Sequence, residues 1–459
     1  MIVGMKRVVA WLALLCLTCF AVQPAMAQSM LRDAETEAWL SDISRPLFQA
    51  AGLSPANAKV VLIQDPSINA FVAGGQIVYI HTGLLDAADS ANQVQGVIAH
   101  EIGHIVGGHA VFQNDGGYTN ISILSLLLGV AAIAAGSPEA GTGMMMMGQR
   151  AAMGKYLAYS RVQESSADAA GARYLGTAGI SGKGMLGFFN KLTKQMHSYG
   201  YYSTSPEVDP FAQTHPMSQQ RVETLTADLQ ANAAWNKPIN QDFETRFKRI
   251  QAKLRGYVNE PKATLRLYPP SDESLPAHYA RAYAYHKSGY PDQAAAETSA
   301  LVKAAPNDPY FLELEGQILL ESGKPAEALA PLREATRRSN SQPLIAATFG
   351  HALIATEDKA NLAEAESVLR QAVARDRENP FAWVNLGTVY DRKGDQARTA
   401  LATAERSNLV GDTRTALISA RAAMNGLPQG SSDWIRAQDI MMVSQTAMEE
   451  DKRNKRRGN

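Results

Sequence analysis

Three residues in one short stretch could carry metal-dependent hydrolysis: His100, Glu101 and His104, in the order His-Glu-x-x-His. Residues four apart project from the same face of an α-helix, so both imidazoles could hold one zinc ion. Glu101 would lie beside that face, where its carboxylate could take a proton from water next to the metal. The motif also occurs by chance on surface helices, so the rest of the chain must supply a third ligand and a substrate-binding element.

Two carboxylates, Glu164 and Asp168, are also four residues apart, on a helix predicted to begin near Tyr159. Two carboxylates stacked on one face repel each other by about a few tenths of a kcal/mol. A nearby cation would remove that cost, which favours Glu164 as the third zinc ligand. Asp168 would then bond the outer nitrogen of a liganding histidine. For the pair taken alone, a solvated acidic face is the alternative.

Two further residues, His215 and Arg221, belong to a proline-rich loop and the helix that follows it. Delivered late in the chain, they could meet the site and stabilise an oxyanion. An ordinary His-Pro turn is the alternative for His215.

A rival zinc geometry, the metzincin signature, requires Gly at the eighth position and His at the eleventh. Gly107 matches, but the histidine falls one residue early, at His109. One residue turns an α-helix by about 100°, so His109 could be a ligand only if the helix broke at Gly107-Gly108. We predict a structural or outer-sphere role for it.

The helices and strands that must position these residues can be predicted from the local sequence pattern. We expect a helix over residues 28–50, a strand over 59–64, two strands joined through Gly74-Gly75, and a helix over about 91–110 that carries the motif. The hairpin could receive an extended peptide as a further strand, or it could be scaffold only. The apolar segments 121–135 and 144–147 are short for a membrane span. They favour a buried helix pair over a methionine-lined lid, and a membrane-touching role is weaker still.

The first 27 residues have the pattern of an export signal: a basic start, an apolar run over 8–22, and Ala25-Met26-Ala27 before Gln28. An uncleaved anchor is the alternative. Both cysteines, Cys16 and Cys19, lie inside this segment, so a mature chain would have neither disulfides nor thiolate ligands. Such a chain fits a bacterial periplasm, with no integral membrane span after cleavage. The 44 basic and 44 acidic residues balance, so charge does not indicate a nucleic-acid partner.

The second half of the chain repeats with a period of 34 residues. The segment 288–294 recurs at 322–328, and Pro309 recurs at Pro343, whereas Pro380 follows after 37 residues. The last clear unit has the frame Trp-x-x-Leu-Gly-x-x-Tyr over 383–390. This is the tetratricopeptide pattern of stacked helix pairs. We expect four units over about 276–411, capping helices to residue 448, and a frayed basic tail over 449–459.

In combination, these features resemble the HtpX/BepA-type zinc metallopeptidases, above all their periplasmic members that carry repeats. The motif at 100–104, the carboxylate pair, the His-Pro with Arg221, and the hairpin over 69–85 carry the resemblance. It implies one zinc ion on His100, His104 and Glu164, Glu101 as general base, and Asp168 as outer-sphere partner. It also implies a mobile loop on which His215 blocks or assists turnover, and, less directly, a substrate or structural contact for Arg221.

The predicted fold is mainly α with a small β element. A gluzincin-like zinc metallopeptidase domain (28–255) is followed by a linker (256–275) and a tetratricopeptide-repeat solenoid (276–448). The expected function is a periplasmic endopeptidase and chaperone in quality control and assembly of outer-membrane proteins. Its substrates would be unfolded or misassembled outer-membrane proteins, and its repeats would contact the assembly machinery. One alternative is an assembly scaffold that works through the repeats with a latent zinc site. A weaker one is a hydrolase of small esters or amides.

Overall fold

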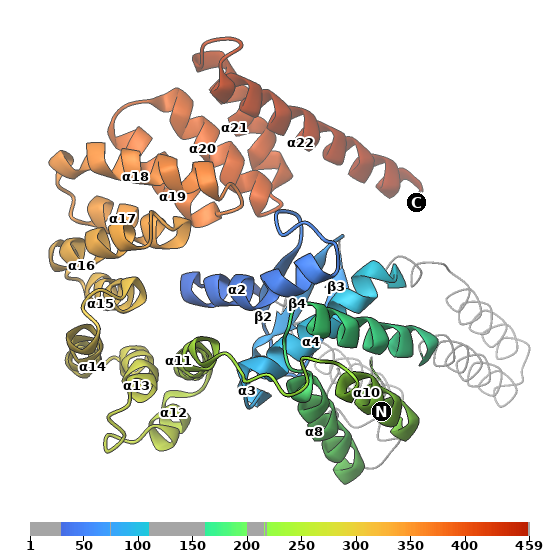
Figure 1. Ribbon diagram of the computed structural model, residues 1–459. Coiled ribbons are helices and arrows are strands. Elements are labelled where there is room, and N and C mark those ends of the chain that lie inside the picture. Colours follow the sequence, from blue (N-terminus) through green and yellow to red (C-terminus); the bar gives the residue numbers. More distant parts are fainter. Residues whose placement is uncertain (1–28, 74, 110–160, 200–214, 216–217, 458–459) are drawn as a thin grey trace, which may run out of the picture.

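A computed structural model describes residues 29–73, 75–109, 161–199, 215 and 218–457. Helices make up most of these residues, and a single small sheet lies among the helices that precede the repeats (Figure 1). The predicted mainly α fold with a small β element is therefore confirmed. The export signal and the apolar segments 121–135 and 144–147 lie outside the described residues. No helix within the described ranges has the length and apolar character to cross a membrane.

The sheet has the strand order β1-β2-β4-β3. β2 (Lys59–Gln64) runs parallel to β4 (Ile77–His81), and β3 (Ala70–Ala73) pairs antiparallel with β4, with Ala70 opposite Ile80. These three strands match the prediction. β1 (Ser29–Met30) was predicted as helix. The helix α2 (Ala34–Ala50) begins later than predicted because Asp33 caps it by accepting a hydrogen bond from Thr36 N. Ser29 and Met30 therefore precede the helix and pair with β2.

The helices α2 (Ala34–Ala50), α3 (Thr82–Ala87) and α4 (Ala91–Val106) pack with the sheet into one apolar core. Every residue of α4 from Ala91 to His104 is buried. A helix over 161–177, α8 (Lys183–Tyr199), α10 (Gln219–Gln230) and α11 (Gln241–Val258) complete this half. α4 ends four residues earlier than predicted because the chain turns at Gly107-Gly108, where Gly108 has φ +65°.

The repeats form four helix pairs and a further pair at the end. The helices are α13 (Leu275–Lys287), α14 (Pro291–Ala304), α15 (Pro309–Glu321), α16 (Pro325–Arg338), α17 (Pro343–Ala355), α18 (Leu362–Arg375), α19 (Pro380–Arg392), α20 (Gln396–Leu409), α21 (Thr413–Gly426) and α22 (Ser432–Arg457). The repeated prolines stand at the first position of their helices, where a missing N–H costs nothing. The three extra residues of the longer unit form a 3₁₀ turn, η1 (Lys359–Asn361).

Two segments are more regular than the sequence suggested. The expected linker contains α12 (Pro261–Leu267), which begins with a proline at its first position, and α11 packs directly against α13. In the basic tail, α22 continues to Arg457, since no glycine or proline interrupts the segment before Gly458. The connection between the two halves is therefore partly helical, with α12 between α11 and α13.

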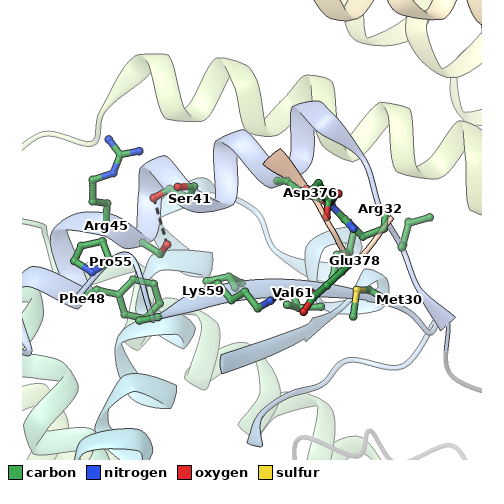
Figure 2. Close-up of a pocket in the computed structure, with 16 residues that line it drawn as sticks. Met30, Arg32, Ser41, Arg45, Phe48, Pro55, Lys59, Val61, Asp376 and Glu378 are labelled. Atoms are coloured by element: carbon green, nitrogen blue, oxygen red, sulfur yellow. Dashed lines mark hydrogen bonds and ion pairs between the residues drawn. The ribbon is translucent and has the colours of Figure 1, made fainter. Parts of the chain in front are cut away.

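The repeats curve around the N-terminal end of α2 (Figure 1). Ala34 is buried in one apolar cluster with Leu312, Ala335 and Ile345 of the repeats. A cavity of about 420 Å³ lies between α2, β2 and the turn that contains Asp376 and Glu378 (Figure 2). The start of α2 thus packs against the repeats, whereas a cavity separates β2 from the turn of the repeats at residues 376–378.

Candidate metal centre

Two helices that cross at close range bring the chemistry-bearing residues together. Gly103 on α4 lies so near the helix 161–177 that a Cβ there would be 2.7 Å from the carbonyl oxygen of Ala167. Gly171, on the helix 161–177, also lies close to α4: a Cβ at this position would be 3.2 Å from the carbonyl carbon of Ala99. Because the backbones touch, Glu164 reaches the two histidines of α4. Gly103, inside the motif, is the residue from which this crossing could have been predicted, although we made no such prediction.

Four buried side chains converge: His100, His104, Glu164 and His215 each offer a ligand atom, and these atoms all lie within 4.8 Å of one another. Nε2 of His104 is 3.1 Å from Nε2 of His100 and 3.3 Å from Oε1 of Glu164. Nδ1 of His215 is 3.0 Å from Glu164 and 3.2 Å from His100 Nε2. Ligands bound tetrahedrally at zinc distances are about 3.3 Å apart. The cluster therefore has the dimensions of a site for one small cation.

Asp168 and Arg221 surround this cluster from outside. Oδ1 of Asp168 lies 3.0 Å from Nδ1 of His100, the nitrogen that faces away from the other ligands. Arg221 donates to Asp168 through Nε (2.5 Å) and Nη2 (2.9 Å), and its Nη1 is 3.0 Å from Glu164. Arg221 is buried. The contacts described for Arg221 are with residues of the site itself, Asp168 and Glu164.

The local charge balance favours a cation. The site contains three nearly fully buried carboxylates, those of Glu101, Glu164 and Asp168. The buried positive charge beside them is the guanidinium of Arg221. Burial opposes a charge on His100, but hydrogen bonds and negative charge from Asp168 and Glu164 outweigh it and raise the pKa of His100 to about 10. Burial would also raise the pKa of Glu164, yet the surrounding histidines hold that pKa well below its usual range. With neutral histidines, the cluster carries a charge of about −2.

The carboxylate of Glu101 is buried and lacks hydrogen bonds to described residues. It is 1% exposed, and neither carboxylate oxygen makes a hydrogen bond to any other described residue. The nearest ion-pair partner within the described ranges is His215, whose Nε2 is 3.6 Å from Oε1. A buried carboxylate without hydrogen bonds is costly unless something supplies them. A metal ion with its water would do so, and the residues present fit such a group.

Three further aromatic rings, those of His215, His109 and Phe189, lie in or beside the cluster. His215 lies among the potential ligands, although the loop residues beside it are outside the described chain. His109 is not among them: its Nδ1 lies 2.8 Å from the outer nitrogen of His104, which disfavours the metzincin geometry. Phe189 of α8, which our sequence reasoning missed, stands edge-on to His100 at 5.4 Å and beneath Arg221. Only its place on an apolar helix face could have indicated it.

Comparisons with known proteins agree with this geometry. Residues 34–228 match peptidase family M48, and residues 279–343 match a tetratricopeptide repeat family. A putative beta-barrel assembly-enhancing protease of Vibrio cholerae serotype O1 is 26% identical over 297 residues, 62% of this chain and 59% of that protein. The beta-barrel assembly-enhancing protease of Escherichia coli O157:H7 is 25% identical over 385 residues, 81% of this chain and 75% of its own length. Metalloprotease YcaL of Escherichia coli K12 is 28% identical over 153 residues, 33% of this chain and 57% of YcaL.

The two family matches fall on the two halves of the fold, the first on the helices that carry the cluster and the second on the helix pairs. The predicted resemblance to metallopeptidases with repeats is thereby confirmed. This chain thus combines a domain similar to the metallopeptidases of family M48, over residues 34–228, with tetratricopeptide repeats that follow it.

Proposed function

We propose that this protein is a zinc-dependent endopeptidase, with chaperone activity, that acts in the periplasm on outer-membrane proteins during their assembly. The observation that carries the proposal is the buried Glu101 carboxylate, without hydrogen bonds to described residues, beside four convergent ligand atoms. The names of the relatives support a role in the assembly of outer-membrane proteins. The export-signal pattern at the start of the chain supports a location in the periplasm.

In this proposal, His100, His104 and Glu164 hold one zinc ion per chain, and Asp168 orients His100. When bound, zinc supplies a Lewis acid that polarises a scissile carbonyl and makes a nearby water more acidic. Glu101 takes the proton of the attacking water and delivers it to the leaving amine. Burial of Glu101 keeps bulk water from competing for that proton.

The substrate would bind as an extended strand along β3. This strand is at the edge of the sheet, pairs only with β4 among the described strands, and packs beside α4. Main-chain hydrogen bonds to an edge strand accept many sequences, which suits substrates that are unfolded rather than specific.

His215 is proposed as the regulated element of the site. Its Nδ1 lies within hydrogen-bonding distance of both His100 and Glu164. A fourth protein ligand closes a metal site, whereas hydrolysis needs an open position. We therefore expect movement of His215 to precede turnover, after which the residue can stabilise the oxyanion.

The repeats are proposed to receive partners, either substrates or the outer-membrane assembly machinery. A cavity of about 790 Å³ lies between residues 30–34, α11 and the repeats, and its wall includes Tyr257, Tyr283, Tyr310 and Phe381. Phe381 is 46% exposed. Accessible aromatic rings are typical of surfaces that bind polypeptide. For the two parts we propose the boundaries 28–255 and 276–448, joined by a connection that contains α12.

The test is the substitution Glu101→Gln in the full chain. We expect proteolysis of an unfolded outer-membrane protein to be abolished, while zinc content and the circular dichroism spectrum stay at parental values. Gln keeps the size of the side chain but cannot accept the proton. A Glu101→Gln protein that still cleaves would contradict the assignment of the general base.

The second candidate function is an assembly scaffold with a latent zinc site, and the place of His215 among the ligands favours it. Cells that lack the protein and have an outer-membrane assembly defect would distinguish the two. Full rescue by His104→Ala, together with no rescue by a chain without residues 276–459, would indicate the scaffold.

A further inference from the structure

His109 contacts a metal-site residue but is not itself one of the convergent ligands. Its Nδ1 lies 2.8 Å from Nδ1 of His104, and the two rings meet edge-to-face at 4.9 Å. Both side chains are buried, with His109 8% and His104 7% exposed. This contact is close enough to determine which nitrogen of His104 carries the proton.

The chemistry of two facing ring nitrogens allows only one arrangement in a metal-binding state. Nε2 of His104 faces the cluster and must be unprotonated to bind a cation, so its proton resides on Nδ1. That N–H must then donate to Nδ1 of His109, which accepts. His109 is therefore a neutral ring with its own proton on Nε2.

The chain has a dedicated turn for this contact. α4 ends at Val106, and Gly108 adopts φ +65°, a conformation that favours glycine. A Cβ on Gly107 would lie 2.5 Å from Nε2 of His109. Two glycines in succession thus let the chain fold back so that the ring of His109 packs over the end of its own helix.

We propose that His109 is a positioning residue that holds His104 in the tautomer and orientation needed for the metal, as Asp168 does for His100. The inference rests on the proposed zinc site. Both liganding histidines then have a buried partner on their outer nitrogen, at 3.0 Å from Asp168 and 2.8 Å from His109. A neutral partner at the second position keeps the charge of the cluster at about −2, which matches one divalent cation.

The experiment compares His109→Leu with His109→Asn in the full chain, by zinc competition against a chromogenic chelator. Oδ1 of Asn can accept a hydrogen bond near the place of Nδ1, whereas Leu has similar bulk and no acceptor. Loss of an outer-sphere partner typically weakens metal binding by about 10–100-fold. We expect that loss for Leu and retention within about threefold for Asn. Gly107→Ala, which displaces the ring, should behave as Leu does.

Chemical unfolding of the metal-free proteins separates positioning from packing. We expect the metal-free Leu and Asn variants to unfold at closely similar denaturant concentrations. Parental zinc affinity in His109→Leu would overturn the inference and leave the proposed function intact. Equal loss in Leu and Asn, with equal destabilisation of both metal-free proteins, would also overturn it. A parent protein that binds no zinc would instead overturn the proposed function, and the inference with it.

Discussion

Two buried clusters of charge in this molecule differ in whether the chain itself neutralises them. In the metal centre, when the histidines are neutral as metal binding requires, the three carboxylates of Glu101, Glu164 and Asp168 have one cationic neighbour, Arg221. At the boundary with the repeats, the N-terminal turn of α2 meets two cations of α11, Arg249 and Lys253. Both clusters are assembled from distant parts of the chain, so their difference is one of charge balance.

The boundary cluster is closely paired. Arg249 lies 2.6 Å from Glu35 and 2.7 Å from Asp308, and Lys253 pairs with Asp33 and Glu35. The hydroxyl of Tyr279 donates to Glu35 at 2.8 Å. The side chains of Asp33 and Asp308 are 18% and 17% exposed, so water reaches the carboxylates that exceed the cations.

The comparison shows how to recognise a ligand site from charge alone. Where the chain supplies the counter-charges, or leaves the excess near water, a buried ion cluster is structural. Where the excess negative charge is fully enclosed, as around Glu101 and Glu164, it is offset either by protonation of a neighbouring histidine or by a cation from outside, which displaces that proton. Substitutions that change the charge of the metal centre should therefore lower zinc affinity, whereas substitutions that change the charge of the boundary cluster should lower the free energy of unfolding.

The largest effect is expected for Glu164→Ala, which removes a proposed ligand and one of the enclosed charges. Zinc affinity should fall by more than the 10–100-fold typical of an outer-sphere partner, and proteolysis should be lost. Chelator competition and cleavage assays measure the two effects. Glu223→Ala, an exposed carboxylate on α10, is the matched control and should retain both properties. Unchanged zinc affinity in Glu164→Ala would contradict the assignment of this ligand.

The next effect is expected for Lys253→Met, which leaves Asp33 and Glu35 short of one cation. Removing one partner of a buried ion pair costs about 3–5 kcal/mol. We expect such a loss in the free energy of unfolding, measured with urea, and unchanged zinc affinity. Lys248→Met, on the exposed side of the same helix, should cost less than about 1 kcal/mol. A fall in zinc affinity in Lys253→Met would show that the two clusters are coupled.

The smallest effect, counted per pH unit, is the dependence of zinc affinity on pH. In the metal-free protein the pKa of His100 is raised to about 10, so this ring is protonated at neutral pH and zinc must displace its proton. Zinc affinity should therefore rise about tenfold per pH unit from pH 7, and level off near pH 10. Calorimetry in buffers of different ionisation enthalpy should detect about one released proton. In Asp168→Asn the pKa of His100 falls, so fewer protons should be released. A release that stays the same in this variant would contradict the role of Asp168.

Features that depend on local pattern were predictable from the sequence. The spacing of His100 and His104 placed them on one helix face, a β-rich run identified β2, and Gly74-Gly75 identified the hairpin. The 34-residue period identified the helix pairs. The exact ends of α4 and α22 were less predictable, because chain reversal at Gly107-Gly108 and extension past Met448 are close energetic choices between helix and coil.

Contacts between distant residues were decided by the tertiary structure. The sequence by itself determined which residue types could hold a metal and which helices carry them. Only the crossing of α4 with the helix 161–177, close because of Gly103 and Gly171, brings Glu164 to the histidines. That Glu101 is buried without a hydrogen bond to any described residue also depends on tertiary packing. The same is true of Arg221 and His109, whose partners depend on packing and on a glycine turn. Helical periodicity is a local property, whereas charge balance is a sum over every element that packs around a site.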